Sequence, residues 1–431
     1  MDLTRQPPRR PSNTSVAGMC GVARMTDKAR GHEDETIGEY VYGEASGFDR
    51  KLLGLLDLSA EDFAEAASSY GDAELTEWIR RTSGITDEAI RSFNDEYLGR
   101  EPADDAARER LQKRVEQFAP ERTDIRKNYQ AMELDDWGSF REVDLTKRAP
   151  RSPYCRDGAG IYAVARMADK ARADRTGKLN DYIYDCPIDK GVLGFLGISA
   201  EAFQNAAWEN PNDVELSAWV RANSNLTSEG VTRFNATIAT AGPTDDGGRE
   251  FFNGLREKVA PGRIDITTWF ELLDLDDEKD YGVVDLSRHA PRSPFDTSVG
   301  GVFCLARLID KGRATGSDTL GPYFYGEDSG LDRAVLAFFG VTADNFRDAL
   351  PSHKTDGDVL AWMEKNGKKS ETETEELNNS LNALAPTTDD RRAWLKRTVE
   401  GFDPARSDVT TFLAFVQLDD RVTWARHKAG V

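Results

Sequence analysis

A set of charged side chains recurs three times along the chain with the same spacing. Each set has the order Arg-x-x-Asp-Lys-x-Arg, and a Tyr-x-Tyr strip follows it. On a helix that turns about 100° per residue, the first Arg, the Asp and the Lys share one face. The candidate binding residues are Arg24, Asp27, Lys28, Arg30, Tyr40 and Tyr42, then Arg166, Asp169, Lys170, Arg172, Tyr182 and Tyr184, then Arg307, Asp310, Lys311, Arg313, Tyr323 and Tyr325.

These residue types could bind a small anion. The guanidinium groups can make paired hydrogen bonds to a carboxylate or a phosphate, the Asp can orient them, and the tyrosines can supply hydroxyl groups. The alternative is an internal salt-bridge network that fastens the charged helix to a Pro/Arg opening before it and to the Tyr strip. We favour the network, because no nucleophile and no set of metal ligands accompanies the charges.

Cysteine and histidine occupy different positions in the three copies. A shared zinc site, disulfide framework or histidine-based triad is therefore excluded. Free, buried thiols are the expected state of the cysteines. No catalytic residue, metal or cofactor is predicted. The residues concerned are Cys20, Cys155, Cys186, Cys304, His32, His289, His353 and His427.

A second recurring acid lies just before the next helix in each copy, at Asp49, Asp189 and Asp332. A carboxylate there can cap the helix, since it accepts hydrogen bonds from free amides and opposes the helix dipole. The other reading is a general base, which would need a pocket and a raised pKa. Capping is the favoured interpretation.

The elements that position these residues are predicted to be mainly helical. Apolar residues in the stretch from Ile161 to Ala173 follow helical spacing, which predicts the first helix of the second copy. The Tyr-x-Tyr strip is predicted to be a brief strand or an extended loop. Further helices are predicted from hydroxyl caps and from aromatic residues expected in the core: the caps are Ser59, Ser199, Thr342, Thr86, Thr227 and Ser370, and the aromatic residues are Phe63, Phe203, Phe346, Trp78, Trp219 and Trp362.

The last helix of each copy is predicted to open at Asp124, Asp265 or Asp408. It is predicted to end at residues 134–136, 275–277 or 418–420. The joints that follow, residues 137–142 and 278–284, are short, so we expect neighbouring domains to touch.

The whole chain is built from three copies of one unit. The pattern D-L-[ST]-[RK]-x-[PA]-P-R starts at Asp2, Asp144 and Asp285. The predicted domains are residues 1–141, 142–283 and 284–431, and each is large enough to bury its own core. The predicted fold class is mainly α, with three tandem homologous small helical domains and at most a short β or extended strip in each.

The charge balance limits the partners. The 431 residues include 76 acidic and 56 basic side chains, a formal net charge of -20. Such a field repels nucleic acid and anionic membranes, so neither is expected as a partner. No stretch approaches the roughly 18 apolar residues of a membrane span, and the Arg-rich start lacks the apolar segment of a secretory signal. A cytoplasmic location is expected.

Three runs within residues 144–189 carry a family resemblance. They are D-L-T-K-R-A-P-R-S-P, A-R-M-A-D-K-A-R and D-Y-I-Y-D-C-P-I-D. Together they resemble the bacterial domain-of-unknown-function family 5069, which normally occurs as a single small domain. The middle copy, with Cys186 to Asp189, is the most similar. The first and third copies have a longer segment there, Gly43 to Phe48 and Gly326 to Leu331. The resemblance implies a repeated fold unit and no known activity.

Two classes of function remain. The favoured one is a non-catalytic binding or scaffolding protein that presents three similar surfaces to an unknown protein. The other is a receptor or an enzyme for a small anionic ligand, which would use the charged helix and the Tyr strip. The first predicts that the charges are satisfied internally or face a partner. The second predicts a concave pocket beside them.

Overall fold

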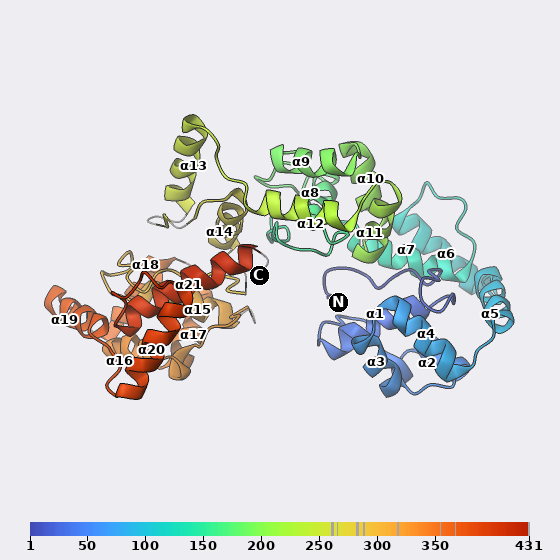
Figure 1. Ribbon diagram of the computed structural model, residues 1–431. Coiled ribbons are helices and arrows are strands. Elements are labelled where there is room, and N and C mark those ends of the chain that lie inside the picture. The colour runs from blue at the N-terminus through green and yellow to red at the C-terminus, as the bar shows by residue number, and fades with distance from the viewer. Residues whose placement is uncertain are drawn as a thin grey trace. The chain divides into compact units, whose positions relative to one another are not determined.

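A computed structural model of the chain describes residues 1–259, 263–264, 266–281, 284–287, 289–316, 319–353, 355–366 and 368–429 (Figure 1). In these residues every element is a helix, which confirms the predicted mainly α class. None of the described helices is long and apolar enough to cross a membrane. The chain divides into two compact units, Met1–Val231 and Thr232–Val431, and their boundary falls inside the second copy.

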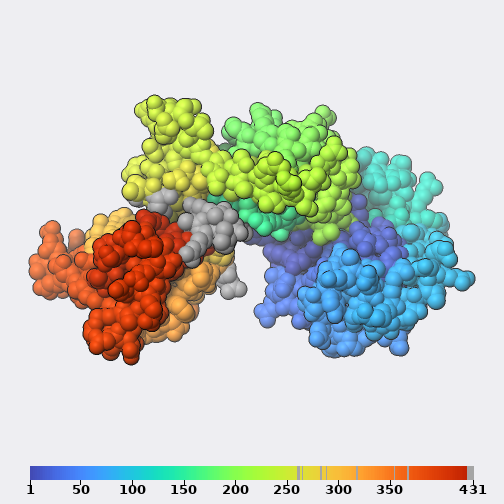
Figure 2. Space-filling model, viewed as in Figure 1, coloured from blue at the N-terminus to red at the C-terminus, as the bar shows by residue number. Residues whose placement is uncertain are grey.

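The first copy lies wholly in the first unit. Its helices are α1 (Val22–Glu33), the short 3-10 turn η1 (Gly43–Ala45), α2 (Gly47–Leu56), α3 (Ala60–Ser69), α4 (Asp72–Ser83), α5 (Asp87–Gly99), α6 (Asp105–Phe118) and α7 (Asn128–Phe140). Helix α1 packs on α3, and α6 and α7 form an antiparallel pair. On the face seen in Figure 2, side chains fill the spaces between the ribbons of α1 to α4.

The second and third copies repeat this order. The second has α8 (Val164–Arg175), α9 (Pro187–Leu196), α10 (Ala200–Glu209), α11 (Asp213–Ala222), α12 (Ser228–Ala239), α13 (Asp246–Val259) and α14 (Trp269–Tyr281). The third has α15 (Leu305–Gly316), η2 (Gly326–Asp328), α16 (Gly330–Phe339), α17 (Ala343–Ala349), η3 (Leu350–Ser352), α18 (Asp356–Met363), η4 (Glu364–Asn366), α19 (Glu371–Asn382), α20 (Asp389–Phe402) and α21 (Phe412–Ala429).

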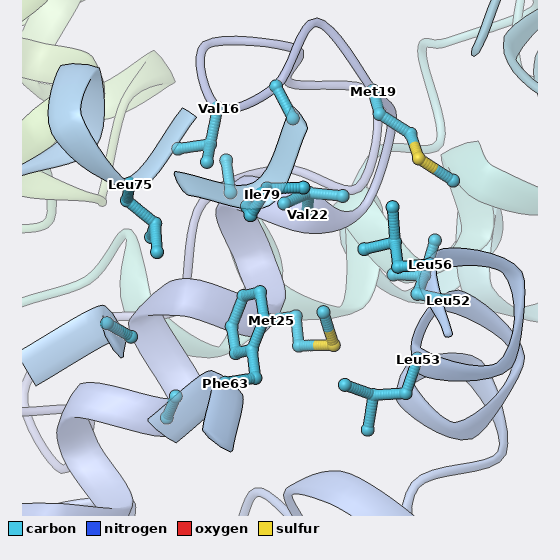
Figure 3. Close-up of a cluster of buried hydrophobic side chains, with 14 of the residues drawn as sticks. Val16, Met19, Val22, Met25, Leu52, Leu53, Leu56, Phe63, Leu75 and Ile79 are labelled. Atoms are coloured by element: carbon cyan, nitrogen blue, oxygen red, sulfur yellow. The ribbon is translucent and has the colours of Figure 1, made fainter. Parts of the chain in front are cut away.

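The core of the first copy forms around α1. Phe63 from α3 and Met25 from α1 point toward each other, and Leu75 and Ile79 approach from α4 (Figure 3). Phe63, Phe203 and Phe346 are fully buried, as predicted. The tryptophans of the fourth helix are partly buried, and Trp78 and Trp362 pack against the cores of their copies as predicted, at the edge of the core. The buried residues of that helix are one turn apart at Leu75 and Ile79, and the tryptophan lies beside them at the rim.

Hydroxyl caps start the helices where the sequence predicts them. The side chain of Ser59 accepts a hydrogen bond from Asp62 N (3.0 Å), and Thr86 accepts one from Ala89 N (3.2 Å). The caps at Ser199, Thr342, Thr227 and Ser370 are formed in the same way. These bonds satisfy amides that the first helical turn leaves free, and each typically contributes about 1 kcal/mol.

Three boundary predictions were wrong. Helix α8 begins at Val164 and not at Ile161, because Ala163 adopts a left-handed backbone (φ 64°) that cannot belong to the helix. Helix α7 begins at Asn128, since the Asp124 carboxylate pairs with Arg122 and does not cap it. The same helix continues past residue 136 to Phe140. In the third copy, α21 begins at Phe412 and not at Asp408, and it continues past residue 420. The start predicted for the second copy, Asp265, lies outside the described residues.

Two further predictions concern the loop between the first and second helices. The Tyr-x-Tyr strip is an extended loop, with Tyr42 at φ -117° and ψ 153°. The predicted cap of the second helix is wrong by three residues. Ser46 is the cap of α2, and Asp49 lies in the first turn, fully buried. In the second copy Cys186 holds the cap position, and the Asp189 carboxylate accepts its backbone N–H (3.3 Å).

The first two copies contact each other inside the first unit. Trp137 Nε1 donates to the carbonyl of Trp208 (2.9 Å), and their rings meet edge to face. The guanidinium of Arg141 stacks on both rings. Near the N-terminus, Arg10 N donates to Glu215 Oε1 (2.9 Å). Trp137 and Trp208 have no tryptophan counterparts in the other copies, so this aromatic contact belongs to this pair of copies.

Candidate functional site

The first polar group of the first copy centres on Arg9, which comes from the Pro/Arg opening. Arg9 is fully buried. Its Nη2 donates to Asp27 Oδ1 (2.7 Å), its backbone N–H donates to Asp27 Oδ2 (2.7 Å), and its Nη1 pairs with Asp72. Arg30 completes the group, since its Nη1 donates to Asp72 Oδ1 (3.0 Å) and its Nε donates to the carbonyl of Ala67 (2.9 Å). The group therefore ties the opening, α1, α3 and α4 together.

The second group joins the first helix to the last one. Arg24 Nη1 donates to Asp136 Oδ2 (2.5 Å), although the two residues are 112 positions apart. The hydroxyl of Tyr40 donates to Asp136 Oδ1 (2.8 Å), and the Arg24 guanidinium lies 5.4 Å from the centre of the Tyr40 ring. Burial and the Asp136 carboxylate raise the pKa of Tyr40 well above its usual value, so the phenol stays protonated and donates.

The third group holds the Tyr strip. Lys28 Nζ donates to Asp49 Oδ1 (2.6 Å), to Ser46 Oγ (3.2 Å) and to the carbonyl of Val41 (3.1 Å). The hydroxyl of Tyr42 donates to the carbonyl of Ala60 at the start of α3 (2.7 Å). Burial lowers the pKa of Lys28, and the Asp49 carboxylate opposes that shift. All three donor positions of the ammonium group are used.

The third copy reproduces the three groups. Arg292 pairs with Asp310 (2.8 Å) and Asp356 (2.5 Å), Arg307 pairs with Asp420 (2.6 Å), and Lys311 pairs with Asp332 (2.6 Å). The tyrosine hydroxyls also repeat, because Tyr323 donates to Asp420 (3.1 Å) and Tyr325 donates to the carbonyl of Ala343 (2.7 Å). Arg313 lies 3.8 Å from Asp356.

The second copy keeps the first and third groups and enlarges the first. Arg151 pairs with Asp169 (2.9 Å) and Asp213 (2.5 Å). Arg148 adds a further guanidinium 3.8 Å from Asp169, at the position that is Gln6 in the first copy. Arg172 donates to the carbonyls of Ala207 and Asn210 (both 2.9 Å).

The remaining predicted site residues of the second copy repeat part of the contacts of their counterparts. Lys170 Nζ contacts Asp189 (2.7 Å) and Cys186 Sγ (3.4 Å), and Tyr184 donates to Ala200 (2.6 Å). Arg166 Nη1 donates to the carbonyl of Arg151 (3.2 Å), and its guanidinium lies 5.4 Å from the Tyr182 ring centre.

The charged groups near Arg148 have shifted pKa values. Burial would raise the pKa of Asp169, but Arg151 and Arg148 lower it to about 2. Burial lowers the pKa of Arg172 to about 10, and Arg151 contributes in the same direction. Burial raises the pKa of Asp213, against the effect of Arg151. The first group of the second copy contains one more guanidinium than that of the first copy.

The described thiols offer little reactivity where their state is resolved. Cys20, Cys155 and Cys304 are buried, and all four cysteines are free. Burial raises the pKa of Cys20 to about 11 and that of Cys155 and Cys304 to about 12, so these thiols remain protonated near neutral pH. In the described part of the chain, no group of His, Cys, Asp and Glu is arranged to hold a metal ion.

A shallow, open pocket lies on α13, lined by Gly247, Glu250, Phe251, Gly254, Leu255 and Lys258. None of the predicted site residues lines it. The charged helix and the Tyr strip are instead packed together by their own ion pairs and hydrogen bonds.

Sequence reasoning missed three partners in the ion-pair network of the first copy. Arg9, Asp72 and Asp136 were not predicted as site residues, and Asp136 was interpreted only as a helix end. A signal was present, because each of these positions holds the same residue type in all three copies: Arg9, Arg151 and Arg292, then Asp72, Asp213 and Asp356, then Asp136, Asp277 and Asp420.

Comparison with protein families identifies the repeated unit. A family model described as "Domain of unknown function (DUF5069)" matches the chain three times, at residues 5–137, 147–279 and 288–422. A search of curated proteins found no match to the chain. The three matched ranges together cover most of the sequence, and each contains one charged helix and one Tyr strip.

Proposed function

The chain belongs to the DUF5069 family in three tandem copies, and from this premise we propose that it is a non-catalytic binding or scaffolding protein. Each copy supplies a similar set of helices, and linkage of similar units raises the strength of binding to a partner with several sites. The charged helix and the Tyr strip then serve the fold, and the surfaces that meet a partner lie outside them.

The observation that carries this proposal is the internal pairing of the charged side chains. Arg24, Asp27, Lys28 and Asp49 are each nine-tenths or more buried, and each has an ion-pair partner in its own copy. The third copy repeats those pairs. A site for a soluble ligand would need at least one such group to face a cavity, and paired charges in a packed interior gain little from a further ligand.

The first test is a ligand screen on the full chain. Thermal unfolding is followed with millimolar citrate, phosphate and sugar phosphates, and we expect no change in Tm, because a ligand that binds the native state would raise it. The control is Tyr40→Phe, which removes one hydroxyl and keeps the ring. A compound that stabilises the natural chain and not this variant would contradict the proposal.

The second test looks for the binding partner directly. The tagged full chain is recovered from the cells that produce it, and the protein that co-purifies is made separately and titrated back by calorimetry. We expect saturable binding that weakens when the number of copies is reduced. If no recovered protein binds the purified chain, the binding role is wrong.

One observation favours a small anionic ligand as a second candidate function, with the second copy as the receptor or enzyme domain. Arg148 brings a further guanidinium to within 3.8 Å of Asp169, and its side chain is 35% exposed. An anion could reach it from solvent and share the positive charge of Arg151 and Arg172.

The substitution Arg148→Gln tests this candidate, because the first copy already has Gln6 at that position. If the candidate is correct, phosphate or citrate should raise the Tm of the natural chain and not that of the variant. Equal Tm changes in both proteins would exclude Arg148 as a ligand-binding residue.

A further inference from the structure

Each copy exposes one apolar side chain between the two tyrosines of its strip. Val41 is 53% exposed, Ile183 is 66% exposed and Phe324 is 70% exposed. We refer to these three as the tip residues. Single exposed apolar residues are common on soluble proteins and by themselves need no explanation. The recurrence at one position in three copies that differ widely elsewhere does need one.

Other large apolar residues are exposed in the described part of the chain, and none of them recurs in this manner. Phe251 and Trp394 share one position, but the first copy has Arg110 there. Ile264 stands opposite polar residues in the other copies, and Leu55 stands opposite phenylalanines that are partly buried. Among these residues, the tip is therefore the one position where all three copies keep a large apolar side chain in contact with water.

The backbone beneath each tip residue is fixed by the buried lysine. Lys28 Nζ donates to the carbonyl of Val41 (3.1 Å), Lys170 donates to that of Ile183 (3.0 Å), and Lys311 donates to that of Phe324 (3.0 Å).

The next residue is fixed as well, because the second tyrosine of every strip donates its hydroxyl to the first residue of the third helix. In the first copy Gly43 follows with a left-handed backbone (φ 65°), and a Cβ there would meet Ala60 at 2.9 Å. The loop holds its shape before any partner arrives, which reduces the entropy lost on binding.

The residues around each tip carry negative charge. Glu39 and Glu44 flank Val41, Asp181 and Asp185 flank Ile183, and Glu327 follows Phe324. All five are at least partly exposed, and no Lys or Arg lies within three residues of a tip on either side. An apolar contact surrounded by acidic residues favours a partner whose apolar side chain is flanked by basic residues.

Building on the proposed binding function, we infer that the tip residues are docking points for a polypeptide segment in which an apolar side chain is flanked by Lys or Arg. The partner's apolar side chain packs on Val41, Ile183 or Phe324, and its cations pair with the neighbouring carboxylates. The acids disfavour an anionic membrane, and they disfavour a second copy of this chain, since both would bring like charge to the tip.

The test uses the full chain and labelled short peptides as probes. Each peptide has a central Leu, Ile or Phe flanked by lysine and arginine, by serine or by glutamate. Fluorescence anisotropy should show binding of the basic-flanked peptides only, and the affinity should fall as salt is added. Replacement of all three tips, with Val41→Ser, Ile183→Ser and Phe324→Ser, should weaken binding at least about tenfold.

A matched control removes one exposed apolar side chain from each copy at another place. The variant with Leu55→Ser, Ile264→Ser and Leu384→Ser should bind the basic peptides as the natural chain does. All six positions are exposed, so neither variant is expected to lose stability. Circular dichroism and Tm confirm that both remain folded.

Each other outcome overturns the inference. If no peptide binds, if glutamate-flanked peptides bind equally, or if the control variant weakens binding as much as the tip variant, the tips are not selective docking points. Dimerisation that the tip substitutions abolish would identify a second copy as the occupant. Binding of the tips to vesicles with anionic lipid would identify a membrane instead. If the tip variant still retains the protein recovered from cells, only this inference fails and the proposed function stands.

Discussion

At the scale of single residues, one buried aspartate organises each copy. Asp27 accepts hydrogen bonds from the backbone N–H, Nε and Nη2 of Arg9, and both residues are fully buried. Two charges withdrawn from water are tolerable only as a pair, because either one alone would keep its desolvation cost without compensation. The pair therefore specifies how the opening lies on α1, and it adds less net stability than its short distances suggest.

Replacing one partner of this pair should strongly destabilise the first copy. We expect Asp27→Asn to lower the free energy of unfolding of the first copy by about 3–5 kcal/mol, since Arg9 would lose this ion pair and keep the one with Asp72. Urea denaturation, followed as the shift in the transition that includes that copy, measures the effect. The control is Asp124→Asn, which breaks an exposed pair with Arg122 and should leave the midpoint unchanged. Equal shifts in the two variants would contradict this account.

A histidine makes the stability of the third copy depend on pH. His289 occupies the position of Gln6 and Arg148, and its ring nitrogens contact Glu278 Oε1 (2.6 Å) and the carbonyl of Ala290 (2.8 Å). Burial alone would lower the pKa of His289, but Glu278 raises it to about 9. The folded-state pKa thus lies above the unfolded value of about 6.5.

The sign of the pH effect follows from this order. Stability from His289 is fully present below about pH 6.5 and is lost as the pH rises through about 9, with a total of up to about 3 kcal/mol. We expect His289→Gln to remove this part of the dependence. Urea titrations of both proteins at pH 6 and above pH 9 give the comparison, and a difference in stability that stays constant across this range would rule out the linkage.

At the scale of elements, close packing sets the relation between helices. Gly138 lies inside α7, where an added Cβ would meet Phe118 of α6 at 2.1 Å. Gly54 lies inside α2 with nothing within 4 Å of the same added atom. Glycine in the middle of a helix costs stability relative to alanine, so the two positions separate helix propensity from packing.

The two alanine substitutions should act in opposite directions. We expect Gly54→Ala to stabilise the first copy by roughly 0.5–1 kcal/mol through propensity alone. Gly138→Ala should destabilise it by about 1–3 kcal/mol, because Phe118 must leave its position. Thermal unfolding of the full chain measures both, and stabilisation by Gly138→Ala would show that α6 and α7 pack more loosely than described.

The elements also show what the sequence could and could not predict. Helical spacing placed Arg24, Asp27 and Lys28 on one face because that relation is local, and the hydroxyl caps were found for the same reason. The local sequence around Asp136 did not reveal its partner, and only its recurrence in all three copies carried a signal. Asp136 pairs with Arg24 across 112 residues, and no local pattern separates a carboxylate that turns inward from one that ends a helix. The predicted start of α8 was wrong because alanine seldom adopts the left-handed backbone seen at Ala163.

At the scale of the whole molecule, the first two copies are in direct contact and are not independent domains. Trp208 meets Trp137 and lies beneath the guanidiniums of Arg141 and Arg175. The corresponding residue of the first copy is Ser68. A contact of this kind couples the stability of the two domains, so unfolding of one should remove part of the support of the other.

The substitution Trp208→Ser tests that coupling with the residue type that the first copy already uses. We expect calorimetry of the natural chain to show the first and second copies unfolding in one transition, and the variant to split it into two. A separate measure is proteolysis of the joint at residues 141–143, which should become faster in the variant. A calorimetric profile that does not change would mean that the tryptophan contact contributes nothing to cooperativity.

The pair of Arg24 with Asp136 has a consequence for a chain that has been cut. The stretch between α5 and α6 is exposed at Glu101, Ala103 and Asp104, so a protease can reach it. After such a cut, Asp136 and the α6–α7 pair would stay attached through Arg24 and through the packing of α7 on α5. A nicked copy would keep its size on a column and separate only in denaturant. The first copy is thus fastened at both ends of its sequence by contacts that do not depend on an intact backbone.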